Sequence, residues 1–230
     1  MRYNPWLRFE PNGPYVLDED KSSVRRYNEL VPAQNRKIIE RTIPEPFIGN
    51  PDSARILLLG LNPGHSPKDF IWHERQDFRQ SMLRNLKHET QAFPFYPLNP
   101  KFNESGAGEW WRKKTYKLQA AAGISDELFS QRLFVIEWFP YHTEKSPYRT
   151  RHLCGPEGVL CESQRYSFEL AQDFMNRNIP VLLMRSRKEW AAVDTRFANA
   201  PSLINPQCAS ISPGNVYASV FEKLVTALQG

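Results

Sequence analysis

The stretch ILLLGLNPGH, residues 56–65, is an apolar run that ends at an Asn-Pro-Gly turn. An unbroken apolar run, without the alternation of a half-exposed strand, is typical of a parallel strand covered on both faces. The turn presents one amide side chain, Asn62, in a loop that Pro63 stiffens and where Gly64 permits close approach of the backbone. We therefore expect a buried strand that delivers Asn62 to its carboxyl end, either as a site residue or bonded to its own turn.

Similar runs along the chain define the fold class. They lie at 55–61, 132–139, 180–186 and, more weakly, 201–206, with helical patterns between them. This alternation predicts an α/β fold, which we expect to be a three-layer α/β/α sandwich around a four-stranded, mainly parallel sheet. The expected strand order is 2-1-3-4, because the run at 55–61 is the most apolar and so belongs in the centre. Helices are expected over 110–122, through 170–175 and after Asn215, which we expect to cap the last helix.

Length and composition favour one folded unit. The chain has 230 residues and 40% hydrophobic content, enough for one sizeable core. Residues 1–50 are polar and rich in proline, so they predict an N-terminal arm, with one short helix near 22–30, packed on a core of residues 51–230. No apolar run is long enough to span a bilayer, and no secretory signal is visible. We expect a monomer.

Net charge and cysteine content bear on the expected partners, location and cofactors of the protein. The net charge of +5 permits contact with a phosphate backbone without requiring it. Three cysteines are an odd number, and a chain of this length needs no disulfide, so a cytoplasmic location is expected. Their spacing has no CxxC pair. We therefore expect no metal and no cofactor.

Four motifs stand in order along the chain. They are GLNPGH at 60–65, FPFYPLNPKF at 93–102 followed by WW at 110–111, FVIEWFP at 134–140 and NPQCAS at 205–210. Together they resemble the motifs of the uracil-DNA glycosylase superfamily, nearest its mismatch-specific and single-strand-selective branches. Each motif alone is short, and their order is the specific part of the resemblance, which covers about residues 54–225.

The resemblance implies a monofunctional DNA base glycosylase of base-excision repair, which hydrolyses the N-glycosidic bond of a flipped damaged or mispaired base. It implies that Asn62 orients the attacking water and that Asn205 holds the departing base. Phe95 would stack on the flipped base. The other substrate-binding positions that it implies are Gly60, Leu61, Pro63, Gly64, His65 and Glu137. The implied partner is DNA, single-stranded or a mismatched duplex, with no membrane and no required protein partner.

Glu137 departs from the pattern of the resemblance. The uracil-specific branches carry an Asn there, which can both accept from and donate to the base, whereas an ionised Glu137 only accepts. Three readings stay open: Glu137 is protonated, or the base offers amino donors, or the pocket no longer processes a base. Glu137 could equally cap the strand end or pair with Arg149 or Arg151. Uracil is therefore not assured as the substrate.

Basic and polar residues follow the strands at the same end of the expected sheet. We expect DNA-backbone contacts from Lys145, Arg149, Arg151, Gln207 and Ser210, although a solvated basic face would give the same pattern. Two functions follow. The first is the DNA base glycosylase; the alternative is a non-catalytic or repurposed member of the same fold that binds nucleic acid or a nucleotide.

Overall fold

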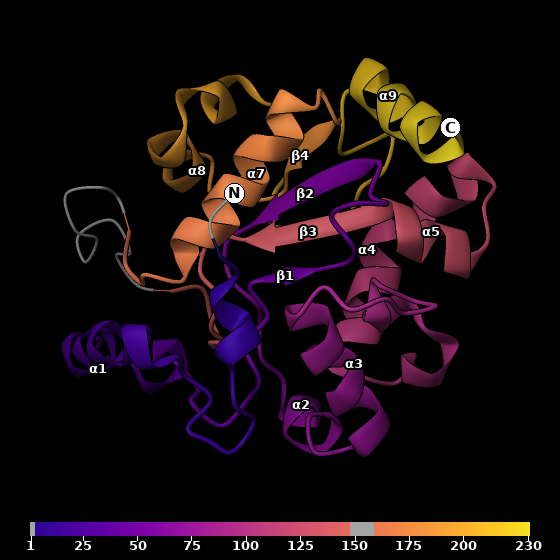
Figure 1. Ribbon diagram of the computed structural model, residues 1–230. Coiled ribbons are helices and arrows are strands. Elements are labelled where there is room, and N and C mark those ends of the chain that lie inside the picture. The colour runs from indigo at the N-terminus through magenta and orange to yellow at the C-terminus, as the bar shows by residue number, and fades with distance from the viewer. Residues whose placement is uncertain (1–2, 148–158) are drawn as a thin grey trace.

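The computed structural model describes residues 3–147 and 159–230 as an α/β fold around an open, mixed sheet of four strands (Figure 1). The strands are β1 Phe47–Ile48, β2 Ile56–Gly60, β3 Leu133–Glu137 and β4 Val181–Leu183. The eight α-helices within the described residues are α1 Lys21–Leu30, α2 Pro67–Trp72, α3 Gln76–Leu86, α4 Gly106–Ala122, α5 Asp126–Arg132, α7 Gln164–Asn176, α8 Arg187–Val193 and α9 Ala218–Gln229. Short 3-10 helices occupy Pro5–Arg8, Asp18–Asp20, Gln34–Arg36, Tyr96–Leu98, Pro100–Phe102 and Thr195–Asn199.

The strand order is β1-β3-β2-β4. β2 pairs in parallel with β3 on one side and with β4 on the other, so the run at 56–60 lies inside the sheet, as its apolar sequence predicts. Every residue of β2 is buried. The register sets Gly60 beside Glu137 at the carboxyl ends of the two strands.

The expected order 2-1-3-4 in a mainly parallel sheet differs from the observed one, because the fourth strand comes from elsewhere in the chain. β1 pairs antiparallel with β3 and makes the sheet mixed. The run at 201–206 contributes only one isolated bridge, between Ser202 and Leu183. Pro201 and Pro206 at its two ends cannot donate to a ladder, which limits the pairing there.

Side chains along β3 alternate between the two faces of the sheet. Phe134 stacks on Phe174 of α7, with ring centroids 5.3 Å apart, so α7 covers one face. Glu137, an odd number of residues along, points to the other face and shares a pocket with Trp111 of α4. α4 therefore lies beside the cavity at this end of the sheet. Its first turn is capped by Ser105, whose hydroxyl accepts from the N–H of Gly108 at 2.9 Å.

The last helix begins later than its sequence suggests. Asn215 does not cap α9, which begins at Ala218 after Tyr217. The Asn215 amide instead donates to the carbonyls of Asn205 and Ser210, at 3.1 and 2.8 Å. It holds the turn ahead of the helix.

The first 50 residues are tied closely to the sheet. Trp6 and Tyr27 are fully buried, and β1 lies within this segment. Gly49, which follows β1, has a φ of +118°, and a Cβ there would lie 2.4 Å from the carbonyl oxygen of Leu133. Only glycine fits that approach. The segment therefore supplies the edge of the sheet and, as shown below, part of a pocket.

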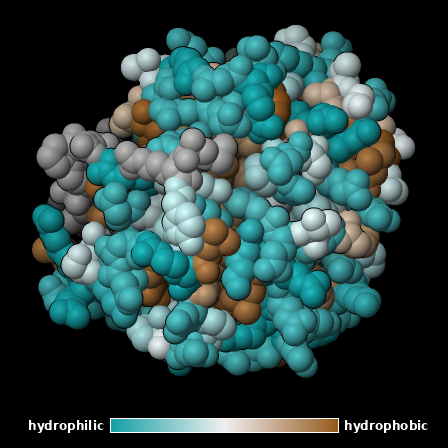
Figure 2. All heavy atoms as spheres, viewed as in Figure 1, coloured by the Kyte–Doolittle hydropathy of each residue, from teal (hydrophilic) through white to brown (hydrophobic). Residues whose placement is uncertain are grey.

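The surface seen in Figure 2 is mostly hydrophilic, with apolar residues in small separate patches. Within the described ranges, no helix combines the length and the apolar character needed to cross a membrane.

Candidate functional site

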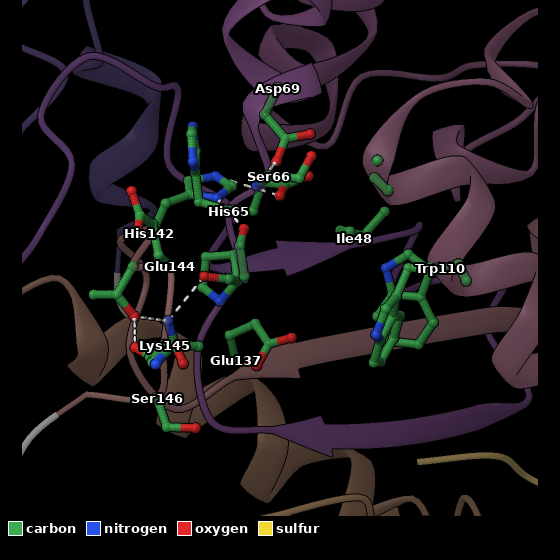
Figure 3. Close-up of a pocket in the computed structure, with 18 of the residues that line it drawn as sticks. Ile48, His65, Ser66, Asp69, Trp110, Glu137, His142, Glu144, Lys145 and Ser146 are labelled. Atoms are coloured by element: carbon green, nitrogen blue, oxygen red, sulfur yellow. Dashed lines mark hydrogen bonds and ion pairs between the residues drawn. The ribbon is translucent and has the colours of Figure 1, made fainter. Parts of the chain in front are cut away.

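A cavity of about 270 Å³ lies beyond the carboxyl ends of β2 and β3, just below the ~300–1,000 Å³ typical of small-molecule sites (Figure 3). In an open α/β sheet this is where ligands bind. The lining residues come from the loop after β2, the end of β3, the segments after β3 and β4, the N-terminal segment, α2 with its C-cap, and the first two turns of α4. Prominent among them are Glu45, Ile48, Asn62, His65, Asp69, Trp110, Trp111, Glu137, His142, Lys145 and Arg185.

Asn62 reaches this cavity with its amide held in one orientation. Its Nδ2 donates to the carbonyl of Pro63 and to the hydroxyl of Thr143, each at 2.8 Å. The Thr143 hydroxyl in turn donates to the carbonyl of Lys145 at 2.6 Å. Both amide protons are thus used, and Oδ1 is left as an acceptor. The bond to Pro63 is the local turn contact expected of Asn, and the bond to Thr143 is a tertiary one.

Glu137 ends β3 with its carboxyl lying across the neighbouring strand. A Cβ on Gly60 would lie 2.0 Å from Glu137 Oε2, so glycine at this position leaves the space that the carboxyl occupies. Oε2 is buried, and no hydrogen-bond partner for it is present among the described residues. Burial raises the pKa of Glu137 from 4.5 to about 8, and the charge of Arg185 opposes the shift only in part. At neutral pH the carboxyl is mostly protonated.

Behind Glu137 lies a second buried carboxyl, Glu45, from the N-terminal segment. Burial raises its pKa well above the ordinary value, and the charges of Asp69 and Glu137 add to the shift. The hydroxyl of Tyr96 hydrogen-bonds to Glu45 Oε1. His142 Nε2 lies 3.4 Å from Glu45 Oε2. These contacts hold a second carboxyl, with a raised pKa, at the wall of the cavity.

Three histidines line the same side of the cavity. His142 Nδ1 contacts the carbonyl of Gly64 at 2.7 Å, and its Nε2 contacts that of Ile43 at 3.0 Å. Burial lowers the pKa of His65 and lowers that of His73 well below its ordinary value. His65 Nε2 is buried, with no partner among the described residues. The lowered pKa values of His65 and His73 favour their neutral forms over the phosphate-binding cation that an exposed histidine could supply.

The aromatic wall of the cavity is formed by Trp110 and Trp111 of α4, whose rings meet edge to face with centroids 4.6 Å apart. Figure 3 shows Trp110 on the side of the cavity across from Glu137. Phe95 does not line it. Its ring is fully buried behind Trp111, with centroids 5.0 Å apart, so the expected stacking position is filled by a core side chain.

Asn205 also lies away from the cavity. It is exposed, and its Oδ1 accepts from the N–H of Gln207 at 3.1 Å and of Cys208 at 3.4 Å, which is the bonding of an Asx turn. Gln207 is exposed beside it, and Ser210 binds Asn215 through its carbonyl. The expectation that Asn62, Phe95, Glu137 and Asn205 share one pocket is therefore met by Asn62 and Glu137 alone.

Some of the other expected site residues line the cavity and some do not. Pro63, Gly64, His65 and Lys145 line the cavity, whereas Leu61 and Gly60 are not part of its lining. Gly60 acts through the room it gives Glu137. Arg149 and Arg151 lie outside the described residues. Arg185, placed by the sequence only among flanking basic residues, lines the cavity near Glu137.

Sequence reasoning did not identify Glu45, Thr143 or Trp110 as site residues. Glu45 stands between two prolines, directly ahead of β1, and an acidic residue in such a rigid, apolar setting was the available signal. Trp110 lies in a predicted helix, where an aromatic pair is usually core. Nothing in the sequence around Thr143 marks it.

No protein-family model matches the chain, and comparison with curated proteins and with solved structures likewise gives no match. In the described part of the chain, no group of three or more His, Cys, Asp and Glu side chains is arranged to hold a metal ion. The site is thus defined by its own geometry.

Proposed function

We propose that this protein is a monofunctional DNA base glycosylase of the uracil-DNA glycosylase kind, acting on a flipped base seated in the cavity. The carrying observation is that Asn62 meets the carboxyl of Glu137 in one cavity, at the ends of two adjacent parallel strands, and that the buried Oε2 of Glu137 has no partner among the described residues. The proposal extends to the layers of the fold, an α/β/α sandwich, and to a cytoplasmic monomer that works in base-excision repair on single-stranded or mismatched DNA.

Hydrolysis of the N-glycosidic bond requires a positioned water and a group that stabilises the negative charge on the departing base. Asn62 Oδ1 accepts a hydrogen bond from a water and aims it at the anomeric carbon of the sugar. The C–O bond forms as the N-glycosidic bond breaks, the bonding electrons leave with the base, and the proton that the water loses passes through solvent to the departed base. Protonated Glu137 donates a hydrogen bond to a carbonyl of that base, where the negative charge develops. Trp111 offers a ring at the cavity wall against which the base can stack.

A protonated carboxyl changes which bases fit. It presents one donor and one acceptor side by side, the same pair that an amide presents. This pair matches an edge with adjacent N–H and C=O groups, found in uracil, hypoxanthine and xanthine. The direction of the Glu137 pKa thus favours the first of the three readings of this residue.

The test is an excision assay. Oligonucleotides carrying uracil, hypoxanthine, xanthine or mismatched thymine are incubated with the protein, and abasic sites are scored by alkaline cleavage. We expect excision of at least one base with the N–H and C=O edge. Asn62→Ala should slow it about 100-fold or more, the scale of losing one group that acts in the transition state. Asn103→Ala, at an exposed asparagine outside the cavity lining, is the matched control and should match the wild type.

One observation favours the alternative, a non-catalytic or repurposed nucleic-acid or nucleotide-binding protein of the same fold. Asn205 is held in an exposed turn, so the cavity lacks the second amide that the resemblance implies. Binding of an oligonucleotide by the folded protein, with no abasic site from any lesion, would replace the glycosylase with this second function.

A further inference from the structure

The mouth of the cavity is bordered by exposed rings on two different helices. Phe70 of α2 is 37% exposed and contacts His65, a lining residue, with ring centroids 4.4 Å apart. Trp110 of α4 is also 37% exposed and lines the cavity itself. Ile71, next to Phe70, is 70% exposed. Large apolar side chains are normally covered by other groups. Exposed ones beside the mouth of a cavity therefore indicate a surface that binds a ligand.

Cations accompany both rings. The guanidinium of Arg41 lies 4.8 Å from the centroid of Phe70, and the ammonium of Lys114 lies 5.8 Å from that of Trp110. Such pairs hold a positive charge over one face of each ring. The mouth is therefore aromatic and basic on both of these sides.

Further charges complete the rim. Lys145 and Arg185 line the cavity, with Lys145 on the side across from Trp110 (Figure 3). Lys68 is neutralised by Glu109 at 2.5 Å. Among the described residues, Glu144 and Asp69 are opposing charges at the cavity, beside the three cations Arg41, Lys145 and Arg185.

We propose that this rim binds single-stranded DNA, with the nucleotides that flank the seated base stacked on Phe70 and Trp110 and their phosphates held by Arg41 and Lys145. This inference rests on the proposed function in taking the cavity as the seat of one base. It adds the strand form of the substrate and assigns the rim residues to the flanking nucleotides.

The rings favour a single strand over a duplex for a physical reason. An exposed ring binds a base through the faces of the two π-systems, and every unpaired base has such a face free. In a duplex these faces are covered by neighbouring base pairs. Cations beside the rings suit the backbone of a flexible strand, which passes close to the bases it carries.

The test measures binding with undamaged DNA, so that it does not depend on catalysis. Anisotropy of a labelled single strand of about 12 nucleotides, within the range of single-strand sites, is compared with that of its duplex. We expect the full-length protein to bind the single strand at least about tenfold more tightly. Phe70→Ala should weaken single-strand binding about 5- to 150-fold, the effect of one stacked base. Arg41→Gln should lower the salt slope of log K by about 0.7.

Tyr116→Ala is the matched control, because Tyr116 is an exposed ring of α4 that does not line the cavity. It should bind as the wild type does. Duplex binding as tight as single-strand binding, or equal affinities of Phe70→Ala and Tyr116→Ala, would overturn the inference even if excision occurs. Single-strand binding that depends on Phe70, with no excision of any lesion, would uphold the inference and remove only the proposed reaction.

Discussion

Replacing Glu137 with Gln tests the protonation state on which the proposed chemistry depends. Gln has nearly the same shape, and Gly60 leaves the space that the side chain needs. Its amide supplies one donor and one acceptor at every pH, whereas the carboxyl supplies a donor only while it is protonated. The Gln variant therefore keeps the donor and acceptor of the protonated carboxyl and removes their dependence on pH.

The magnitude follows from the pKa of about 8 that burial gives Glu137. The protonated fraction falls from about nine-tenths at pH 7 to about one-tenth at pH 9, so excision by the wild type should fall about tenfold over this interval. Excision by Glu137→Gln should stay flat over the same interval. At pH 7 the two rates should agree within a few-fold.

The same residue affects stability with a definite sign. The pKa of Glu137 is higher in the folded chain than its ordinary value of 4.5, so the unfolded chain ionises first as pH rises. Stability is greatest below pH 4.5 and falls until about pH 8, where the folded form also ionises. The linked loss at pH 7 is about 3 kcal/mol, and Glu137→Gln should recover up to that amount.

Two measurements check the predicted pH dependence of excision and the predicted gain in stability. Single-turnover excision is followed from pH 6 to pH 9.5 on the lesion that the wild type cuts best, and urea unfolding is followed at pH 7. A wild-type rate that is unchanged or rises up to pH 9 would show that the carboxyl acts in its ionised form. That result, or a Gln variant with the same alkaline decline, would refute the donor role of Glu137.

Three further substitutions test the geometry. Gly60→Ala places a Cβ 2.0 Å from the Glu137 carboxyl, so excision should fall at least about tenfold in the same assay while far-UV circular dichroism stays unchanged. Thr143→Val removes the acceptor that orients Asn62, and we expect a fall in kcat about fivefold or more with little change in KM. Phe95→Leu should cost about 1–2 kcal/mol of stability by urea unfolding, because the ring is core, and leave KM unchanged; a raised KM with unchanged stability would restore its stacking role.

The amino-acid sequence alone was sufficient to predict the three strands at the centre of the sheet. The runs that became β2, β3 and β4 are apolar apart from the terminal Gly60 and Glu137, and such runs are typical of strands covered on both faces. Because parallel neighbours end at the same edge, the placement of Asn62 and Glu137 at one opening followed from their positions after those runs. These inferences needed only local pattern and strand direction.

The edge of the sheet could not be foreseen in the same way. β1 has two residues, Phe47 and Ile48, too few for any periodicity to register. Its pairing depends on Gly49, which brings the chain within reach of Leu133, a residue far along the sequence. The position of Phe95 also depends on tertiary packing, since an exposed ring and a core ring have the same local sequence.

The two buried acids make a single electrostatic unit, and this explains why the N-terminal segment belongs to the site. If Glu137 ionises, its charge raises the pKa of Glu45 further, so the inner acid holds its proton more firmly. Tyr96 and His142 fix Glu45 in place, and His142 is itself bonded to Gly64 of the loop that carries Asn62. The segment before β1 thus ties Glu45 to the loop that carries Asn62. Such buried acids reduce stability above their ordinary pKa, and a fold has reason to retain them where a neutral donor is needed in the cavity.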